Sequence, residues 1–209
     1  MRNSLIIFAK APLPGKVMTR LGKSIGMRNA SAIYKRMLYR LIGRLVAGHD
    51  YSIELWCSPD TKHPFFRKCS REFDIHLKSQ HGSGLGERMM NAFRESARDS
   101  AKTILIGSDI IAMDTSDIEL AINHLDSCDV VLMPTFDGGY GMIAMKNTSP
   151  HLFMNMEWST SRVLNKTVSR VSRLGLDYRL LDTRRDVDTH KDYIAMSRAV
   201  YISTTFVMG

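Results

Sequence analysis

Short apolar runs alternate with helical patterns along the whole chain, and this alternation constrains the fold more than any other feature. Helical periodicity is clearest over 33–45, 85–97 and 118–125, each between two runs. We also predict helices over 160–171 and from Thr189 onwards. The predicted strands are 5–8, 52–56, 74–77, 103–106, 129–133, 140–145, 178–181 and 201–207.

This order predicts an α/β fold with a mostly parallel, mixed sheet and helices on both faces. The tight link 136–140 is the exception, where two strands could pair antiparallel. We expect the helix over 118–125 to open with a capping box of Ser116 and Glu119. No repeat or low-complexity linker interrupts the pattern, so we expect a single domain over residues 1–209.

Composition narrows the class of protein. Hydrophobic residues make up 44% and charged residues 24%, as in ordinary globular proteins. No apolar run approaches the roughly 20 residues of a membrane helix, and Lys10 ends the first run too early for a secretory signal. Three scattered cysteines fit a reducing compartment. We therefore expect a cytoplasmic protein without a membrane span.

The net charge of +8 favours anionic partners. Lys and Arg are spread along the chain without a basic block, so a dedicated nucleic-acid surface is not expected. Nucleotides and phosphorylated small molecules remain the partners that the charge favours.

The loop after the first strand combines cations with conformational constraints. Prolines stiffen it, and Gly15 permits close approach of the backbone to a ligand. Lys10, Lys16 and Arg20 could surround a diphosphate, with Thr19 as a further polar contact. The spacing is not that of a Walker loop. The alternative is a solvated connection whose charges only aid solubility.

Carboxylates follow three later strands. Ser108 and Asp109 follow the fourth strand, where Asp109 could hold Mg²⁺ or Mn²⁺; the alternative is a turn or capping aspartate. Asp137 precedes two glycines and could lie near the metal or the acceptor, although Asp-Gly is also a hairpin signal. Asp186 and Asp188 precede the last helix, where they could complete a metal site or complement the helix dipole.

Two further segments could touch a ligand. Gly84 and Gly86 precede or open a helix, and they permit approach of a nucleotide to its N-terminus. Trp158 opens another helical segment, as a pocket wall or as a packed aromatic.

These segments occur together, in order, in one known arrangement. The sequence resembles a family of small bacterial GT-A-type glycosyltransferases, some encoded near radical-SAM and selenium-related domains. That family is in turn similar to nucleotidyltransferases of the molybdopterin-guanine and phospholactate-guanylyl kind. The matching segments are 8–12, 14–16, 19–21, 84–89, 106–109, 137–140, 158–160 and 186–189.

The resemblance implies a nucleotide-diphospho-sugar transferase fold, a divalent metal (Mg²⁺ or Mn²⁺) and a nucleotide held by the first loop. It implies Asp109 and Asp188 as metal ligands and Asp109 and Asp137 as catalytic carboxylates. After Asp109 the family usually has Cys-Pro-Gly-Leu, where this chain has Ile-Ile-Ala-Met. The nucleotide or substrate contacts that it implies are Lys10, Gly15, Lys16, Thr19, Arg20, Gly84, Gly86, Ser108, Gly138, Gly139, Tyr140 and Trp158.

Three functional hypotheses follow. The first is metal-dependent glycosyl transfer from a nucleotide sugar to a small-molecule acceptor. The second is nucleotidyl transfer, which joins a nucleoside triphosphate to a phosphorylated substrate and releases pyrophosphate. The third is a nucleotide-binding protein without catalysis. The apolar run 201–207 could serve as an edge strand or an oligomer interface.

Overall fold

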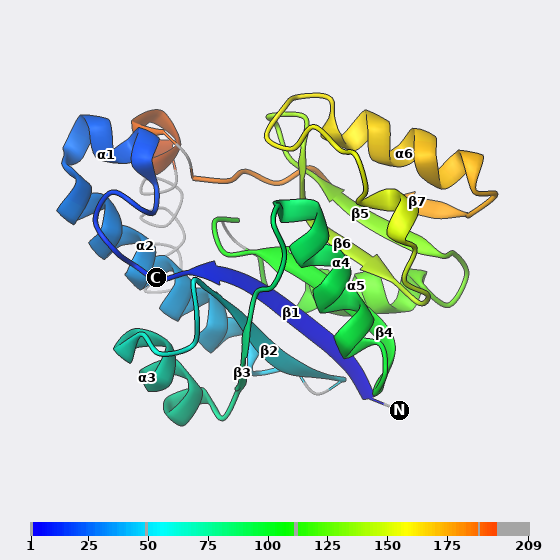
Figure 1. The fold of residues 1–209 in the computed structure, drawn as a ribbon, viewed down its shortest axis with the longest axis horizontal. Helices are drawn as coiled ribbons and strands as arrows, with labels where there is room; N and C mark the ends of the chain where they lie inside the picture. Colours follow the sequence, from blue (N-terminus) through cyan, green and yellow to red (C-terminus); the bar gives the residue numbers. More distant parts are fainter. Residues whose placement is uncertain (1, 49, 111–112, 188, 196–209) are drawn as a thin grey trace, which may run out of the picture.

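The computed structural model describes residues 2–48, 50–110, 113–187 and 189–195. Within them, seven strands form one sheet in the order β3-β2-β1-β4-β6-β5-β7 (Figure 1). The strands are β1 (Arg2–Lys10), β2 (Tyr51–Ser58), β3 (His76–Ser79), β4 (Ser100–Gly107), β5 (Val130–Pro134), β6 (Tyr140–Met145) and β7 (Tyr178–Leu180). The helices are α1 (Thr19–Ile25), α2 (Met27–Leu45), α3 (Pro64–Phe73), α4 (Leu85–Ser96), α5 (Thr115–His124), α6 (Val163–Arg173) and the 3₁₀ helix η1 (Pro150–Leu152). Residues 190–195 are also helical, as expected from Thr189 onwards.

The sheet is mixed, and its one reversal lies where the sequence predicts it. β1 pairs in parallel with both β2 and β4, and β2 pairs in parallel with β3. β6 runs antiparallel to both of its neighbours, β4 and β5. The turn at Asp137 and Gly138 therefore closes a hairpin, and the α/β class with a mostly parallel sheet is confirmed.

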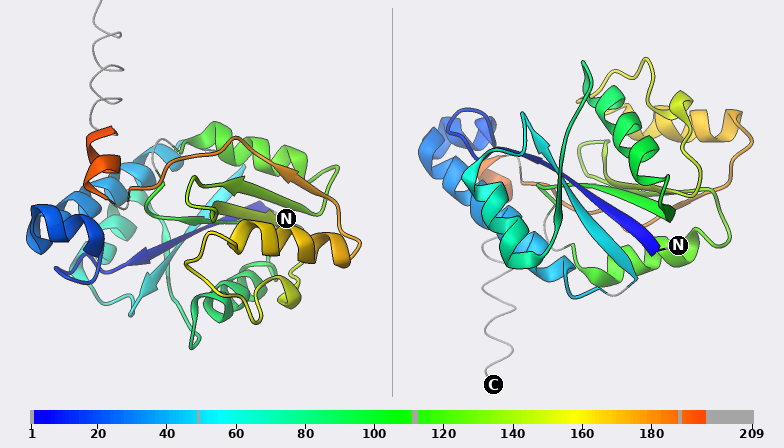
Figure 2. Two further views of the ribbon diagram at one scale, coloured as in Figure 1. Left: turned by 90° about the horizontal axis from the view of Figure 1, so that it is seen from above. Right: turned by 60° about the horizontal axis from the view of Figure 1, so that its bottom comes forward.

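Helices cover both faces of the sheet. Leu5, Ile7 and Ala9 of β1 point into a core built with α2, α3 and α5, whereas Ile6 points into a second core with α4, α6 and η1. Figures 1 and 2 show α4 and α6 on one face and α2 and α5 on the other. Because β1 and β4 are buried on both faces, their sequences are almost continuously apolar.

The chain direction creates a switch point between β1 and β4. From β1 the chain moves outward through β2 and β3, and then returns to place β4 on the other side of β1. Ligands of open α/β sheets bind beyond the carboxyl ends of the strands at such a point. The first loop and the Ser108–Asp109 segment leave the sheet there.

Local predictions needed three corrections. The capping box of α5 uses Asp114 and Asp117 instead of Ser116 and Glu119, because the helix begins at Thr115. The helix expected from residue 160 begins at Val163. Helices α1 and α3 were not predicted. The expected strand 201–207 lies outside the described residues.

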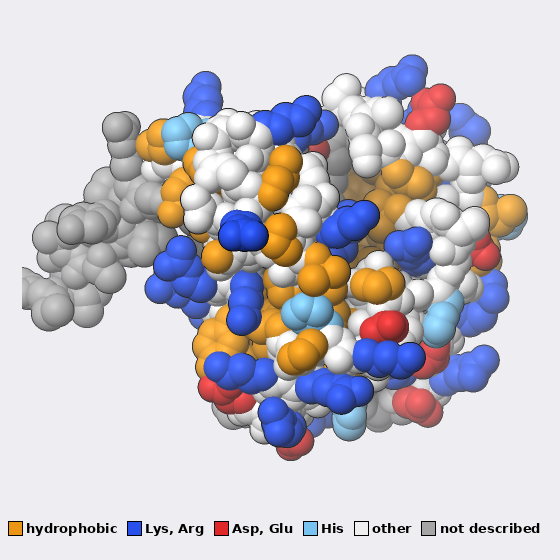
Figure 3. All heavy atoms as spheres, turned by 60° about the vertical axis from the view of Figure 1, so that its left-hand side comes forward, with side chains coloured by type: hydrophobic (Ala, Val, Ile, Leu, Met, Phe, Trp, Pro, Cys, Tyr) orange, Lys and Arg blue, Asp and Glu red, His pale blue; other side chains and the backbone are white. Residues whose placement is uncertain are grey.

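Positive charge is concentrated on the side of the molecule that carries α1, α2 and α3. Residues 19–74 contain 11 Lys and Arg and five Asp and Glu, a net +6 of the chain's +8. Figure 3 shows this side, with many basic and few acidic side chains on its surface. The resulting field attracts anionic ligands towards this part of the protein.

Candidate functional site

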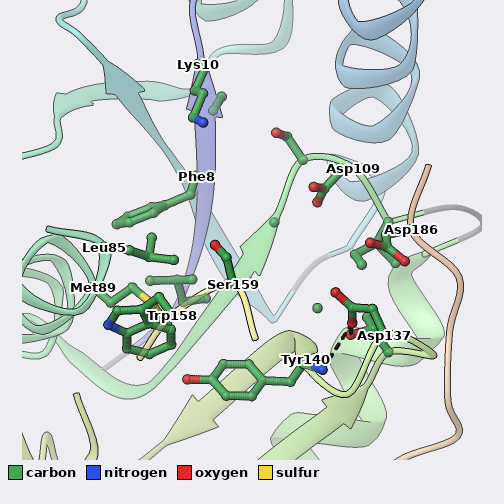
Figure 4. A pocket seen from close by; sticks show the side chains of 18 of the residues that line it. Phe8, Lys10, Leu85, Met89, Asp109, Asp137, Tyr140, Trp158, Ser159 and Asp186 are labelled. Carbon is green, nitrogen blue, oxygen red and sulfur yellow. Dashed lines mark hydrogen bonds between the residues drawn. The ribbon is translucent and has the colours of Figure 1, made fainter. Parts of the chain in front are cut away.

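A pocket of about 640 Å³ opens at the carboxyl ends of β1 and β4. This volume is within the usual range of small-molecule sites. Its walls come from the β1–α1 loop, the start of α4, the segment after β4, the β5–β6 turn, the Trp158 loop and the segment before Val187. Figure 4 shows how the main lining side chains are arranged. The pocket therefore lies at the switch point and collects most of the predicted site segments.

The buried phenol of Tyr34 connects the two strands at the base of this pocket. Its oxygen accepts a hydrogen bond from the Lys10 backbone N–H (2.9 Å) and is bonded to Ser108 Oγ (2.8 Å). Either hydroxyl of this pair can donate the bond, and Ser108 also lines the pocket. Burial raises the pKa of Tyr34 to about 12, so the phenol stays neutral.

The first loop brings two of its three predicted cations to the pocket. Lys10 and Lys16 line it together with Thr19. Gly15 has φ +77° in a turn that the Lys16 N–H to Leu13 C=O bond (3.0 Å) closes. Gly15 therefore shapes the loop and does not line the pocket. Arg20 is exposed in α1 and does not line it either.

Arg88 supplies a third pocket cation. It lies on α4, lines the pocket, and its Nε donates to the Gly82 carbonyl (3.1 Å). Lys10 ends β1, Lys16 lies in the β1–α1 loop and Arg88 lies on α4. Segments that are far apart in sequence thus bring positive charge to one cavity, as a polyanionic ligand requires.

Asp109 lies at the end of β4, next to a second extended segment. Its backbone carbonyl accepts from the Val187 N–H (3.0 Å), and Ile110 forms an antiparallel bridge with Asp186. This pairing places Asp186 in the pocket wall beside Asp109. Asp188, the second predicted metal ligand, lies outside the described residues.

Asp137 is held by the hairpin turn in which it sits. Its Oδ1 accepts from Thr135 Oγ1 (2.6 Å) and from the Gly139 N–H (3.0 Å). Gly138 has φ +85°, and a Cβ there would come within 2.2 Å of the Ser161 carbonyl oxygen. Asp137 and Gly139 line the pocket, whereas Gly138 forms the turn behind it. The hairpin interpretation and an orientation towards the pocket therefore apply together.

Three carboxylates thus face one side of the pocket. Figure 4 shows Asp109, Asp137 and Asp186 opposite an apolar wall. Within the described residues, no three His, Cys, Asp or Glu side chains are close enough to hold a metal ion. Carboxylate oxygens are nevertheless the ligands that Mg²⁺ and Mn²⁺ prefer. A metal bound by one or two of them and by phosphate oxygens fits this chemistry.

The two predicted glycines of α4 have different roles. Gly84 lines the pocket, and a Cβ there would meet no atom within 4 Å. At Gly86 a Cβ would lie 2.5 Å from the Phe153 carbonyl oxygen and 2.6 Å from Trp158 Nε1. Gly86 therefore lets Trp158 pack against α4, and Trp158 lines the pocket with Tyr140.

Sequence reasoning missed several polar residues of the site, among them Arg88, Tyr34 and Gln80. Tyr34 is part of an apolar helical stripe, and nothing in that pattern distinguishes it from a core aromatic. Gln80 follows β3, and its Nε2 donates to the carbonyls of Trp56 (2.7 Å) and Ala9 (3.3 Å). Its position directly after a strand could have indicated it.

Comparison with known proteins shows the family and the fold. Residues 41–160 match the family DUF2064, described as an uncharacterized protein conserved in bacteria. The chain belongs to the DUF2064 family. No curated protein matches it at a significant level.

Among solved structures, one bacterial chain is similar over most of its length. It comes from Desulfovibrio desulfuricans G20 and bears a provisional assignment as a nucleotide-diphospho-sugar transferase. It is 30% identical, with a TM-score of 0.82, over 90% of this chain and 82% of the other. This DUF2064 protein therefore has the fold of the nucleotide-diphospho-sugar transferases. The association with radical-SAM and selenium-related domains stays a prediction.

More distant structures share the fold alone. The 4-diphosphocytidyl-2C-methyl-D-erythritol synthase of Anaerococcus prevotii is 11% identical, with a TM-score of 0.64, over 96% of this chain and 98% of that one. The glucosyl-3-phosphoglycerate synthase of Mycobacterium tuberculosis, in complex with Mn²⁺ and UDP, is 13% identical, with a TM-score of 0.57, over 94% and 76%. Both nucleotidyl and glycosyl transferases thus use this architecture. None of the helices described up to residue 195 is long and apolar enough to cross a membrane.

Proposed function

We propose that this DUF2064 protein transfers a glycosyl group from a nucleoside-diphosphate sugar to a small-molecule acceptor, with Mg²⁺ or Mn²⁺. The observation that carries the proposal is one pocket that joins Lys10, Lys16 and Arg88 to Asp109 and Asp137 at the switch point. A diphosphate needs positive charge around its oxygens, and a transfer reaction needs a carboxylate near the acceptor. Both requirements are met within one cavity.

In this proposal the basic residues contact the diphosphate and the acidic residues contact the metal and the acceptor. Lys10, Lys16 and Arg88 bind the diphosphate, and the Ser108 hydroxyl, which lines the same pocket, is a further polar contact for a phosphate oxygen. Asp109, together with Asp188 as implied by the family resemblance, holds the metal. A bound divalent cation would neutralise charge on the departing diphosphate. Such electrostatic stabilisation contributes several kcal/mol to lowering the barrier.

In this proposal Asp137 acts on the acceptor. Its Oδ1 is engaged by Thr135 and Gly139, so its other oxygen is the one that takes the proton of the acceptor hydroxyl. The acceptor oxygen bonds to the anomeric carbon of the sugar as the bond from that carbon to the diphosphate oxygen breaks. The products are the glycosylated acceptor and a nucleoside diphosphate.

Nucleotidyl transfer is the second candidate. Asp109 is a lone aspartate in the segment after β4, because its sequence neighbours are Ser108 and Ile110. A single carboxylate at this position suits nucleotidyl transfer. The triphosphate would then occupy the same cationic side, and pyrophosphate would leave. Measuring which product accumulates, nucleoside diphosphate or pyrophosphate, separates the two reactions.

A thermal-shift screen tests the site before any acceptor is known. UDP, GDP, CDP, ADP, their sugars and the triphosphates are added with and without Mg²⁺ or Mn²⁺. At 100 times its Kd a ligand stabilises the folded state by about 2.7 kcal/mol, which raises the Tm by about 5–10 °C for a chain of this size. We expect one base class to produce such a shift only with metal.

Asp109→Asn provides the decisive variant, and Asp99→Asn is its matched control at the opposite end of β4. We expect Asp109→Asn to lose the metal-dependent shift while Asp99→Asn keeps it. If Asp109→Asn responds like wild type, Asp109 is not the metal ligand. Nucleotide binding without turnover of any donor would favour the non-catalytic hypothesis.

A further inference from the structure

One side of the pocket consists of apolar side chains. Phe8, Leu85, Met89, Tyr140 and Trp158 line it, and we call this set the apolar wall. Figure 4 shows these five side chains together, across the cavity from Asp109, Asp137 and Asp186. The pocket is therefore divided into a charged half and an apolar half.

The apolar wall has a built geometry. Trp158 packs against α4 because Gly86 has no side chain. A Cβ at Gly86 would lie 2.6 Å from Trp158 Nε1. Tyr140 approaches it edge-on, with ring centroids 6.4 Å apart and an interplanar angle of 82°. Aromatic pairs in such edge-to-face contact are stabilised beyond their simple burial. The indole is thus held from two elements, and its orientation is defined.

Part of this apolar surface is open to a ligand. Leu85, in the first turn of α4, is 43% exposed and lines the pocket. Phe8, Met89, Tyr140 and Trp158 contribute to the core behind it. A large exposed apolar residue in a concave site is a place where an apolar group of a ligand is stabilised on binding.

The chemistry of the wall fits the acceptor better than the nucleotide base. Discrimination among bases requires hydrogen-bonding groups that face the base edge. Gln80 lines the pocket with a hydrogen-bonding side chain, whose Nε2 donates to the carbonyls of Trp56 and Ala9. Trp158 and Tyr140 come instead from the β5–β6 hairpin and the loop after it, beside the hairpin carboxylate Asp137.

We propose that the apolar wall binds an uncharged ring of the acceptor, so that the acceptor class is a hydroxyl compound with an aromatic or alicyclic group next to the reacting hydroxyl. This inference rests on the proposed function, since it assigns the second substrate of the same pocket. The ring lies against Trp158 and Leu85, and the hydroxyl points across the pocket to Asp137. Acceptors that are wholly polar do not use this half of the site.

A matched pair of probes tests the proposal without nucleotide. Phenyl β-D-glucopyranoside and methyl β-D-glucopyranoside differ only in the aglycone, which is a phenyl ring in the first and a methyl group in the second. Their Kd values are measured by ligand-observed NMR titration of the full chain. We expect the phenyl compound to bind about tenfold more tightly. A tenfold ratio corresponds to about 1.4 kcal/mol, the stabilisation from burial of about 55 Å² of apolar surface.

Variants test whether the preference for the phenyl compound comes from the apolar wall. Leu85→Ser removes an exposed side chain and should reduce the ratio to below about threefold, and Trp158→Ala should do the same. Leu174→Ser is the matched control, because Leu174 is 40% exposed and lies outside the pocket. It should keep the tenfold ratio. Leu85→Ser still tests the proposal if Trp158→Ala fails to fold.

The outcomes are separable. Equal binding of the two glycosides, or binding of neither up to the solubility limit, overturns the proposal. Loss of nucleoside-diphosphate affinity in Leu85→Ser, with an unchanged glycoside ratio, would assign the wall to the donor base and also overturn it. A phenyl preference without any nucleotide binding would refute the proposed function while the apolar wall keeps its ring-binding role.

Discussion

Tyr34→Phe is the substitution that most directly tests how the site is held together. The phenol oxygen bridges the ends of β1 and β4, through the Lys10 N–H and Ser108 Oγ. The aromatic ring itself is buried, with 4% of its surface exposed. Phenylalanine keeps the ring and its packing, so the substitution removes the oxygen and both hydrogen bonds and nothing else.

The expected magnitude follows from those two bonds. The Lys10 N–H is left without its acceptor in a partly buried position, which costs about 1–2 kcal/mol, and the lost bond to Ser108 costs about 1 kcal/mol because that hydroxyl can turn to water in the pocket. The sum is about 2–3 kcal/mol. For a chain of this length each kcal/mol shifts the Tm by about 2–4 °C, so we expect the Tm to fall by about 4–12 °C.

Urea unfolding measures the free energy, with Tyr39→Phe as control. Tyr39 lies on the same helix, and its hydroxyl bonds to the exposed Glu72, so its loss should cost less than about 1 kcal/mol. Tyr34→Phe should also weaken nucleotide binding, since Lys10 and Ser108 line the pocket, whereas Tyr39→Phe should not. A change below about 0.5 kcal/mol for Tyr34→Phe would refute the reasoning.

Three further predictions concern stability. Gly86→Ala should cost about 1–3 kcal/mol in urea unfolding and shift the tryptophan emission, because its Cβ collides with Trp158, whereas Gly84→Ala should cost less than about 1 kcal/mol. Arg184→Gln should cost about 1–3 kcal/mol by equilibrium unfolding, since it leaves buried Asp117 without its partner at 2.6 Å. His63 caps α3 through Nδ1, and burial lowers the pKa of its imidazole below 6.5. The contribution of His63 to stability is therefore present above pH 6.5 and is lost as the pH falls through the lower pKa of the folded state.

Each of these three predictions would be contradicted by a specific result. Equal stabilities of Gly86→Ala and Gly84→Ala would mean that Trp158 moves without cost. A loss below about 0.5 kcal/mol in Arg184→Gln would mean that Asp117 finds another partner. For His63 the control is His63→Asn, which keeps a capping acceptor but does not titrate. Thermal scans from pH 7.5 to pH 5 should show a smaller loss of Tm in that variant, and identical profiles would exclude the histidine as the cause.

The sequence predicted elements best where a long apolar pattern carried the signal. Every strand of the described sheet overlaps a predicted run, and the central strands gave the clearest patterns because strands buried on both faces must be apolar almost throughout. The edge strands β3 and β7 are more exposed, and β3 lies at His76–Ser79 instead of 74–77. The short helices α1 and α3 were not predicted. Helix α3 rests on Pro64 at its first position and on His63 as its cap, and a capping histidine is a weak signal in sequence. For α5 two acceptable capping patterns overlap, and only the start of the helix at Thr115 chooses between them.

The site shows the same division. Strand-end residues such as Lys10, Ser108 and Asp109 could be predicted, because the carboxyl ends of parallel strands meet at one edge. Arg88 reaches the pocket from α4 and Gln80 from the segment after β3, and their roles depend on the direction of their side chains. Gly86 was predicted to contact the nucleotide, but it lies behind Trp158, where only the packing of α4 gives it a role.

What this sequence determined by itself is therefore the class of fold and the edge of the sheet where chemistry is placed, since both follow from hydrophobic periodicity and from charges directly after strands. Tertiary structure alone decided which cations share the pocket, that Asp186 lies beside Asp109 and that the carboxylates face an apolar wall. The physical reason is distance along the chain. Periodicity reports on neighbours within a few residues, whereas the contacts of Tyr34 with Ser108 and of Trp158 with α4 join segments that only the folded sheet brings together.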